Sequence, residues 1–189
     1  MTQISRRGFL VATGSAAVLA GCQQTVIGNG VGSRGGAQID ARVLSTQDYL
    51  FSNFPGTRDL ANRARGVLYI PLVTEAGFGL GGGYGRGALI IQGATVDYYS
   101  AAKASFGLQI GAQQYAHALF FMTDQALQEF RRSPGWAASA DIRYATPGDG
   151  GSIGKETTEI NPVIAFVFGQ QGLMAGATLA GVKYSRIIP

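Results

Sequence analysis

The sequence predicts a single α+β domain in which a glycine-rich antiparallel β-sheet packs against helices. Three patterns indicate this class: glycines alternate with apolar residues over 77–81, apolar residues alternate with polar ones or glycine over 105–113, and 123–133 is a well-capped helical segment. A period of two is typical of strands, whereas start and stop signals around a longer segment are typical of helices. The hydrophobic fraction of 46% is ample for a core.

The first 21 residues are predicted to be an export signal that precedes the domain. Arg6 and Arg7 lie in SRRGFL, which has the form of a twin-arginine motif, and a short apolar stretch then leads to LAGC, which ends at Cys22. The stretch is too short to span a bilayer and ends at small residues. An ordinary buried helix is the alternative, but it leaves the arginine pair and the cysteine unexplained.

Cys22 is the only cysteine, so the chain cannot form an internal disulfide. In a lipobox frame, we expect cleavage before Cys22 and acylation of its thiol and new amine, and two or more acyl chains make a stable anchor. No aspartate follows, which favours an exported lipoprotein that faces the periplasm from the outer membrane. Residues 22–39 are the predicted lipidated cysteine and flexible tether, and 40–189 the folded domain.

The charge of the mature chain does not support a nucleic-acid partner. The sequence holds 15 basic and 11 acidic residues, and both Arg6 and Arg7 leave with the signal. Thirteen basic residues then face eleven acidic ones, a formal charge of only +2. The chain contains no arginine- or lysine-rich run of the kind that nucleic-acid-binding domains carry.

Helices are predicted over 40–54, 57–66 and 123–133. Asp40 is the expected N-cap of the first, and Pro55-Gly56 separates it from the second. Thr123 is the expected N-cap of the third, whose acidic start and basic end complement the helix dipole.

Strands are predicted from short apolar or alternating segments. In the glycine-rich region, Gly77, Gly79 and Gly81 leave one strand face bare, which allows another backbone or a helix to approach closely. Gly82 and Gly83 are then expected to form a hairpin turn. The predicted strands are 67–70, 77–81, 85–91, 96–100, 105–113, 163–168 and 173–183.

Two glycine-rich segments resemble nucleotide-binding motifs only formally. Gly77, Gly79 and Gly82 satisfy G-x-G-x-x-G, but the next segment, ALIIQG, is typical of a strand, whereas the dinucleotide fingerprint needs a helix there. Residues 150–155, GGSIGK, lack the P-loop spacing, and Glu156 stands where serine or threonine is required. We therefore expect no nucleotide and no other cofactor.

The sequence offers no clear catalytic or metal-binding set. His117 is the only histidine, so zinc has no ligand set, and a core position is expected for it. A Ser-His-acid triad has no G-x-S-x-G elbow to support it. Residues 160–182 carry no charge and include a G-x-x-x-G pattern, so a transmembrane span is an alternative there. Pro162 and a polar turn at 169–172 favour two strands instead.

Six segments, taken together, carry a family resemblance. They are ARGVLYIPLV, AGFGLGGGYGRGALI, VDYYS, SFGLQIGAQ, ALFFMTDQAL and GQQGLMAGATLAG. In this order and spacing the chain resembles the SYLF lipid-binding domain family, also catalogued as a yeast-type actin-binding domain, from about Arg58 to Pro189. The resemblance implies a non-enzymatic module that engages membranes, and bacterial members are commonly exported lipoproteins. Glu75 stands where bacterial relatives often carry a lysine.

A basic set gives the predicted lipid-binding residues. Arg58 and Arg65 are seven positions apart and are expected to share a helix face, with Arg63 off it and Arg86 and Lys103 nearby. Each basic residue near an anionic membrane contributes about 1 kcal/mol. The alternative is an ordinary solvated helix face.

Three functions remain open from the sequence. The first is a non-enzymatic envelope lipoprotein whose domain binds lipid, another amphiphile or a membrane surface. The second is an envelope scaffold that binds a protein or peptidoglycan and meets the membrane only through Cys22. The third and weakest is a hydrolase with a nucleophile near His117. The sequence identifies no particular protein partner.

Overall fold

The computed structural model describes residues 34–138, 143–145, 161–172 and 179–189. The predicted signal peptide, Cys22 and most of the predicted tether therefore lie outside the described residues. The elements are α2 (Gly35–Asn53), α3 (Gly56–Arg63), β1 (Gly66–Ile91), β2 (Ala94–Phe121), α4 (Asp124–Arg132), β3 (Trp136–Ala137), β4 (Arg143–Ala145), β5 (Val163–Gly172) and β6 (Lys183–Ile187).

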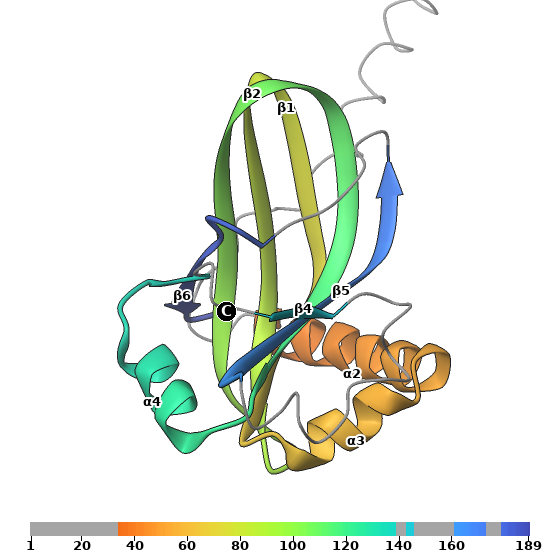
Figure 1. The fold of residues 1–189 in the computed structure, drawn as a ribbon, viewed down its shortest axis with the longest axis vertical. Helices are drawn as coiled ribbons and strands as arrows, with labels where there is room; N and C mark the ends of the chain where they lie inside the picture. The colour runs from red at the N-terminus through yellow and green to blue at the C-terminus, as the bar shows by residue number, and fades with distance from the viewer. Residues whose placement is uncertain (1–33, 139–142, 146–160, 173–178) are drawn as a thin grey trace, which may run out of the picture.

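One long hairpin dominates the fold. β1 and β2 have 26 and 28 residues and pair antiparallel from Gly66↔Phe121 to Ile91↔Ala94. Gln92 and Gly93 connect them with φ angles of 51° and 79°, the positive values that a tight hairpin turn requires. Figure 1 shows both strands arching together, so that each runs up one side of the fold and down the other.

The turn expected at Gly82 and Gly83 is wrong. Both residues stay inside β1, where they pair with Ala104 and Lys103 of β2. β1 reverses earlier, by a sharp bend: a Cβ on Gly77 would lie only 2.8 Å from the Cα of Gly81. Because β2 follows β1 through this bend, backbone hydrogen bonding continues where the sequence pattern predicts a turn.

The bend brings the two halves of β1 against each other, and glycines make this contact possible. A Cβ on Gly85 would lie 2.6 Å from the carbonyl oxygen of Leu72, and one on Gly87 would collide with the carbonyl oxygen of Tyr69. The predicted close approach of a backbone to a bare glycine face is therefore confirmed, but it falls mainly on other glycines than those expected.

β2 is the centre of a six-stranded sheet with the order β3-β6-β2-β5-β4, and β1 pairs with β2 off this path. β5 pairs with residues 113–121 of β2, and β6 pairs with residues 98–102. All pairs are antiparallel except β4 with β5, which is parallel. The predicted sheet is therefore confirmed as mainly antiparallel within an α+β domain, and the parallel pair of β4 and β5 is a difference from the prediction.

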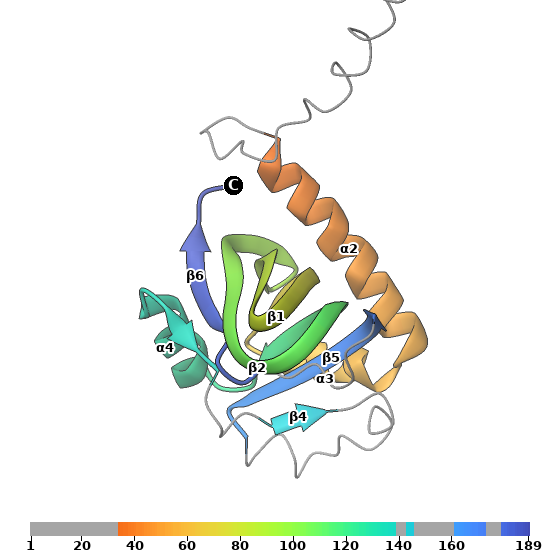
Figure 2. The same ribbon diagram turned by 90° about the horizontal axis from the view of Figure 1, so that it is seen from above.

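Alternate residues of the strands supply two cores. Val67 and Tyr69 face α2 and α3, whereas Leu68 and Ile70 face the inside of the curled sheet. The inner core also receives Phe130 of α4. Figures 1 and 2 show α2 and α4 on opposite sides of the sheet.

Two helix predictions have different outcomes. Asp40 is not an N-cap, because α2 already begins at Gly35 and residues 35–39 of the predicted tether are helical. Burial of Ile39 beside Val43 explains the longer helix. Asp40 instead accepts hydrogen bonds from Thr95 and Tyr98 at 2.9 and 2.8 Å. Thr123 is the N-cap of α4 as predicted, and its side chain accepts from the Ala126 amide at 3.2 Å.

The predicted strand 163–168 is confirmed within β5, but β6 starts only at Lys183. Residues 179–182, expected to be strand, form a turn, and 173–178 lie outside the described residues. None of the helices among the described residues is long and apolar enough to cross a membrane.

Candidate functional site

A buried carboxylate lies inside the curled sheet. Glu75 is 6% exposed and accepts hydrogen bonds from Gln113 at 2.5 Å and from the Tyr115 hydroxyl at 3.0 Å. Lys103 completes the set, with its Nζ 3.1 Å from the Glu75 carboxylate. The four side chains come from β1 and both halves of β2, so the bend itself brings them together. Every oxygen of the buried charge is thereby satisfied.

Lys103 is thus placed away from the predicted lipid-binding set. Its side chain is only 15% exposed and points at Glu75 in the interior. A lysine committed to a buried carboxylate is a structural group, because removing it would leave a buried charge without its counter-ion.

His117 also belongs to this interior. Its Nε2 lies 2.8 Å from the hydroxyl oxygen of Tyr184, and the side chain is fully buried. Burial lowers the pKa of His117 to about 3, so the ring is neutral at physiological pH. The predicted core position is confirmed. Within the described residues, no three His, Cys, Asp or Glu side chains are grouped to hold a metal.

The predicted basic residues near α3 each make a different local contact. α3 ends at Arg63, so the expected common helix face of Arg58 and Arg65 is wrong. The guanidinium of Arg58 lies 4.8 Å from the ring centre of Phe51, and Arg63 donates to the carbonyl of Asp59 at 3.4 Å. Arg65 instead forms an exposed ion pair with Asp124 of α4.

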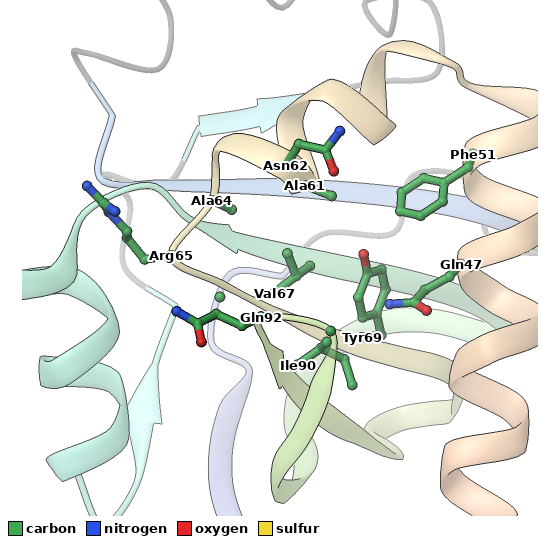
Figure 3. Close-up of a pocket in the computed structure, with 12 residues that line it drawn as sticks. Gln47, Phe51, Ala61, Asn62, Ala64, Arg65, Val67, Tyr69, Ile90 and Gln92 are labelled. Carbon is green, nitrogen blue, oxygen red and sulfur yellow. The ribbon is translucent and has the colours of Figure 1, made fainter.

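A cleft of about 420 Å³ separates α2 and α3 from the start of β1 and the β1–β2 turn. Figure 3 shows Gln47 and Phe51 of α2 facing Tyr69, while Arg65 extends away at the edge. Burial raises the pKa of Tyr69 to about 12, and a hydrogen bond with Gln47 partly offsets the shift. The lining is neutral apart from Arg65, which is paired with Asp124.

A second cavity, of about 400 Å³, lies on the flank of the sheet between α2 and both halves of β1. Arg42 comes from α2 and Arg86 from the second half of β1, and none of the described residues that line this flank cavity is acidic. Among the described residues neither guanidinium has an ion-pair or hydrogen-bond partner. The remaining lining residues are Gln38, Ile39, Pro71, Leu72, Thr74, Tyr84 and Gly85.

Large apolar side chains are exposed next to this cavity and around the bend. We call Leu72, Phe78, Leu80 and Tyr84 the bend patch. Phe78 is 80% and Leu80 68% exposed, and Leu72 and Tyr84 are also exposed while they line the flank cavity. Such a patch at the edge of a folded domain is typical of a surface that meets a partner or a membrane.

The sequence predicts only one of the two flank arginines as a binding residue. Arg86 was in the predicted set, but Arg42 was not, although Gln38 and Arg42 are four positions apart and so share a helix face. The bend patch was also missed, because its apolar residues alternate with glycines in a pattern that equally fits a buried strand.

A comparison with known families supports the resemblance drawn from the sequence. Residues 102–186 match the family described as Ysc84, Las17-binding protein actin regulator. This part of the chain belongs to the Ysc84 (SYLF) family. No curated protein matches the chain.

The SYLF match covers most of β2, then α4 and the strands up to β6. It therefore includes Lys103, Tyr115 and His117 of the interior, but neither arginine of the flank cavity. The family's description names a protein-binding activity for that family, and it does not state what this chain binds.

Proposed function

We propose that the SYLF-type domain of this protein binds the surface of an anionic membrane through the bend patch. The observation that carries the proposal is the exposure of Phe78 and Leu80, at 80% and 68%, at the bend of an otherwise well-packed sheet. Apolar side chains that enter the boundary between headgroups and acyl chains bind in proportion to the apolar area they bury.

Charge at the border of the patch supports the choice of a membrane as the occupant. Arg42 and Arg86 lie beside Leu72 and Tyr84 and face no acidic residue in their cavity. Basic groups next to an apolar surface favour anionic lipid over a neutral surface, by about 1 kcal/mol for each residue. Arg58, Arg63 and Arg65, which form other contacts, stay predictions as lipid-binding residues.

The predicted lipid anchor is part of this proposal. We infer an exported lipoprotein that is acylated at Cys22, faces the periplasm from the outer membrane and performs no catalysis. The residues between Cys22 and Arg34 have the composition of a flexible linker. A flexible segment of this length would span on average about 20 Å, so an anchored domain would stay close to the bilayer.

Vesicle co-sedimentation tests the patch. The full chain with Cys22→Ser, which removes the predicted acylation site, is compared with the same chain carrying Phe78→Ser and Leu80→Ser. We expect the double substitution to lower binding to phosphatidylglycerol vesicles at least tenfold. Val96→Ser is the matched control, since Val96 is 41% exposed and lies close to the β1–β2 turn. Equal binding by all three chains would contradict the proposal.

The family description favours one second candidate, a scaffold that binds a protein partner. In that case Cys22 supplies the only membrane contact. The two candidates differ in the same experiment, because a scaffold with Cys22→Ser would not sediment with vesicles of any composition.

A further inference from the structure

The flank cavity holds two arginines whose side chains no other described residue contacts through an ion pair or hydrogen bond. Arg42 reaches it from α2 and Arg86 from the second half of β1, and neither has a partner within the described part of the chain. Other cations behave differently: Arg131 and Arg186 both contact Asp97, and Lys103 contacts Glu75. Within residues 34–138, 143–145, 161–172 and 179–189, the two flank arginines therefore have free hydrogen-bond donors and a charge that no acidic group compensates.

The shape of the cavity follows from the bend in β1. Gly85 lies in the wall, and its missing side chain lets the second half of β1 approach Leu72 of the first half. Arg86, next in the chain, thereby comes to the same hollow as Thr74 and α2. At about 400 Å³ the hollow falls within the range of small-molecule sites.

The lining combines the groups that phosphate binding needs. Guanidinium groups form strong charge-assisted hydrogen bonds with phosphate oxygens and often bind them in a bidentate manner. Gln38, Thr74 and Tyr84 add neutral donors, and the described lining residues include no carboxylate that would repel an anion. Leu72, which belongs to the bend patch, forms an apolar wall of the cavity.

We propose that the flank cavity binds the phosphate group of a phosphate ester, with Arg42 and Arg86 as its two cationic ligands. The inference rests on the proposed function, because the source we expect is the headgroup of an anionic lipid. The bend patch then contacts the apolar part of the same lipid surface. A soluble phosphate ester has the same chemistry and is the alternative source.

The first experiment measures the phosphate site without a membrane. Glycerol 3-phosphate and inorganic phosphate are titrated by calorimetry into the full chain with Cys22→Ser, alone and with Arg42→Gln/Arg86→Gln. We expect saturable binding that the double substitution abolishes. The control is Arg131→Gln/Arg132→Gln, which removes the same charge from α4 on the other side of the sheet. The proposal would be overturned if the chain with both flank arginines bound no phosphate, or if the control variant lost as much binding as Arg42→Gln/Arg86→Gln.

Vesicles then distinguish the two sources of phosphate. If the site takes a lipid headgroup, each arginine removed lowers affinity for phosphatidylglycerol vesicles by about fivefold, and glycerol 3-phosphate competes with the vesicles. If soluble esters bind but vesicle affinity is unchanged, the site serves a free phosphate ester. If the chain with both arginines binds no phosphate but still sediments with vesicles, only the phosphate-site proposal is overturned. Sedimentation then depends on Phe78 and Leu80. Failure of the membrane proposal instead leaves no sedimentation in any variant.

Discussion

The inside of the curled sheet and its flank next to α2 both hold basic side chains, but they use them in opposite ways. Inside, Lys103 is 15% exposed and is held by Glu75 at 3.1 Å, within a set of groups that satisfy one another. On the flank, Arg42 and Arg86 line an open cavity, and no described residue pairs with them. The contrast teaches that a basic residue indicates a ligand site only when the fold leaves its charge uncompensated.

The largest expected effect comes from the glycine that lets the two halves of β1 meet. Gly87→Ala would place a methyl group against the carbonyl oxygen of Tyr69, a collision that backbone cannot avoid by a rotamer change. We expect a loss of about 4 kcal/mol or more in the free energy of unfolding, or failure to fold. Circular dichroism during urea unfolding measures the change.

Gly82→Ala is the matched control for that substitution. A Cβ on Gly82 would lie 3.4 Å from the nearest atom, the carbonyl oxygen of Lys103, which is ordinary contact. A similar loss for both alanines would show that the close approach of the two halves of β1 does not determine stability.

The next effect tests the interior as a structural site. Lys103→Met leaves the Glu75 carboxylate buried without its counter-ion, and we expect a loss of about 3 kcal/mol in the free energy of unfolding. The double variant Lys103→Met/Glu75→Gln should recover part of this loss, because it removes the uncompensated charge as well. A fully additive double variant would mean that the two side chains do not stabilise each other.

A pH titration examines the same interior through His117. Burial lowers the folded-state pKa of His117 from 6.5 to about 3, so the unfolded chain takes up a proton over this range while the folded chain does not. Stability is therefore full above pH 6.5 and falls toward pH 3, by up to about 1.4 kcal/mol per pH unit. His117→Gln should flatten the fall between pH 6 and 4, as measured by urea unfolding. If His117→Gln left the pH dependence of the free energy of unfolding unchanged, protonation of His117 would not be its cause.

The smallest expected effect lies on the flank. Arg86→Gln should change the free energy of unfolding by less than about 0.5 kcal/mol, because its side chain has no partner to lose among the described residues. Urea unfolding of Arg86→Gln and Lys103→Met under the same conditions measures both changes in the free energy of unfolding. A loss for Arg86→Gln as large as that for Lys103→Met would make the flank arginine structural too.

The sequence predicts local features better than it predicts what the bend brings together. The helix cap at Thr123, the core position of His117 and a bare glycine face follow from neighbouring residues and are confirmed. The position of the bend in β1 does not follow from neighbouring residues, because it depends on the pairing of β1 with β2 along the whole hairpin. The hairpin turn expected at Gly82 and Gly83 failed for that reason.

The candidate sites show the same limit. Lys103 was predicted to be a surface cation because its counter-ion, Glu75, lies on another strand and only the folded pairing brings the two together. The residues next to Arg42 in the sequence do not indicate a binding site. Arg42 becomes a candidate only because the fold places it in the same cavity as Arg86.

The most direct test of the contrast is an NMR spectrum of the arginine side-chain Nε–Hε groups during titration with glycerol 3-phosphate. All arginines are observed at once in the full chain, so each serves as a control for the others. We predict that the signals of Arg42 and Arg86 shift and saturate together, while those of Arg131 and Arg186, which contact Asp97, stay in place. Equal shifts for all four, or no shift for the flank pair, would contradict the account.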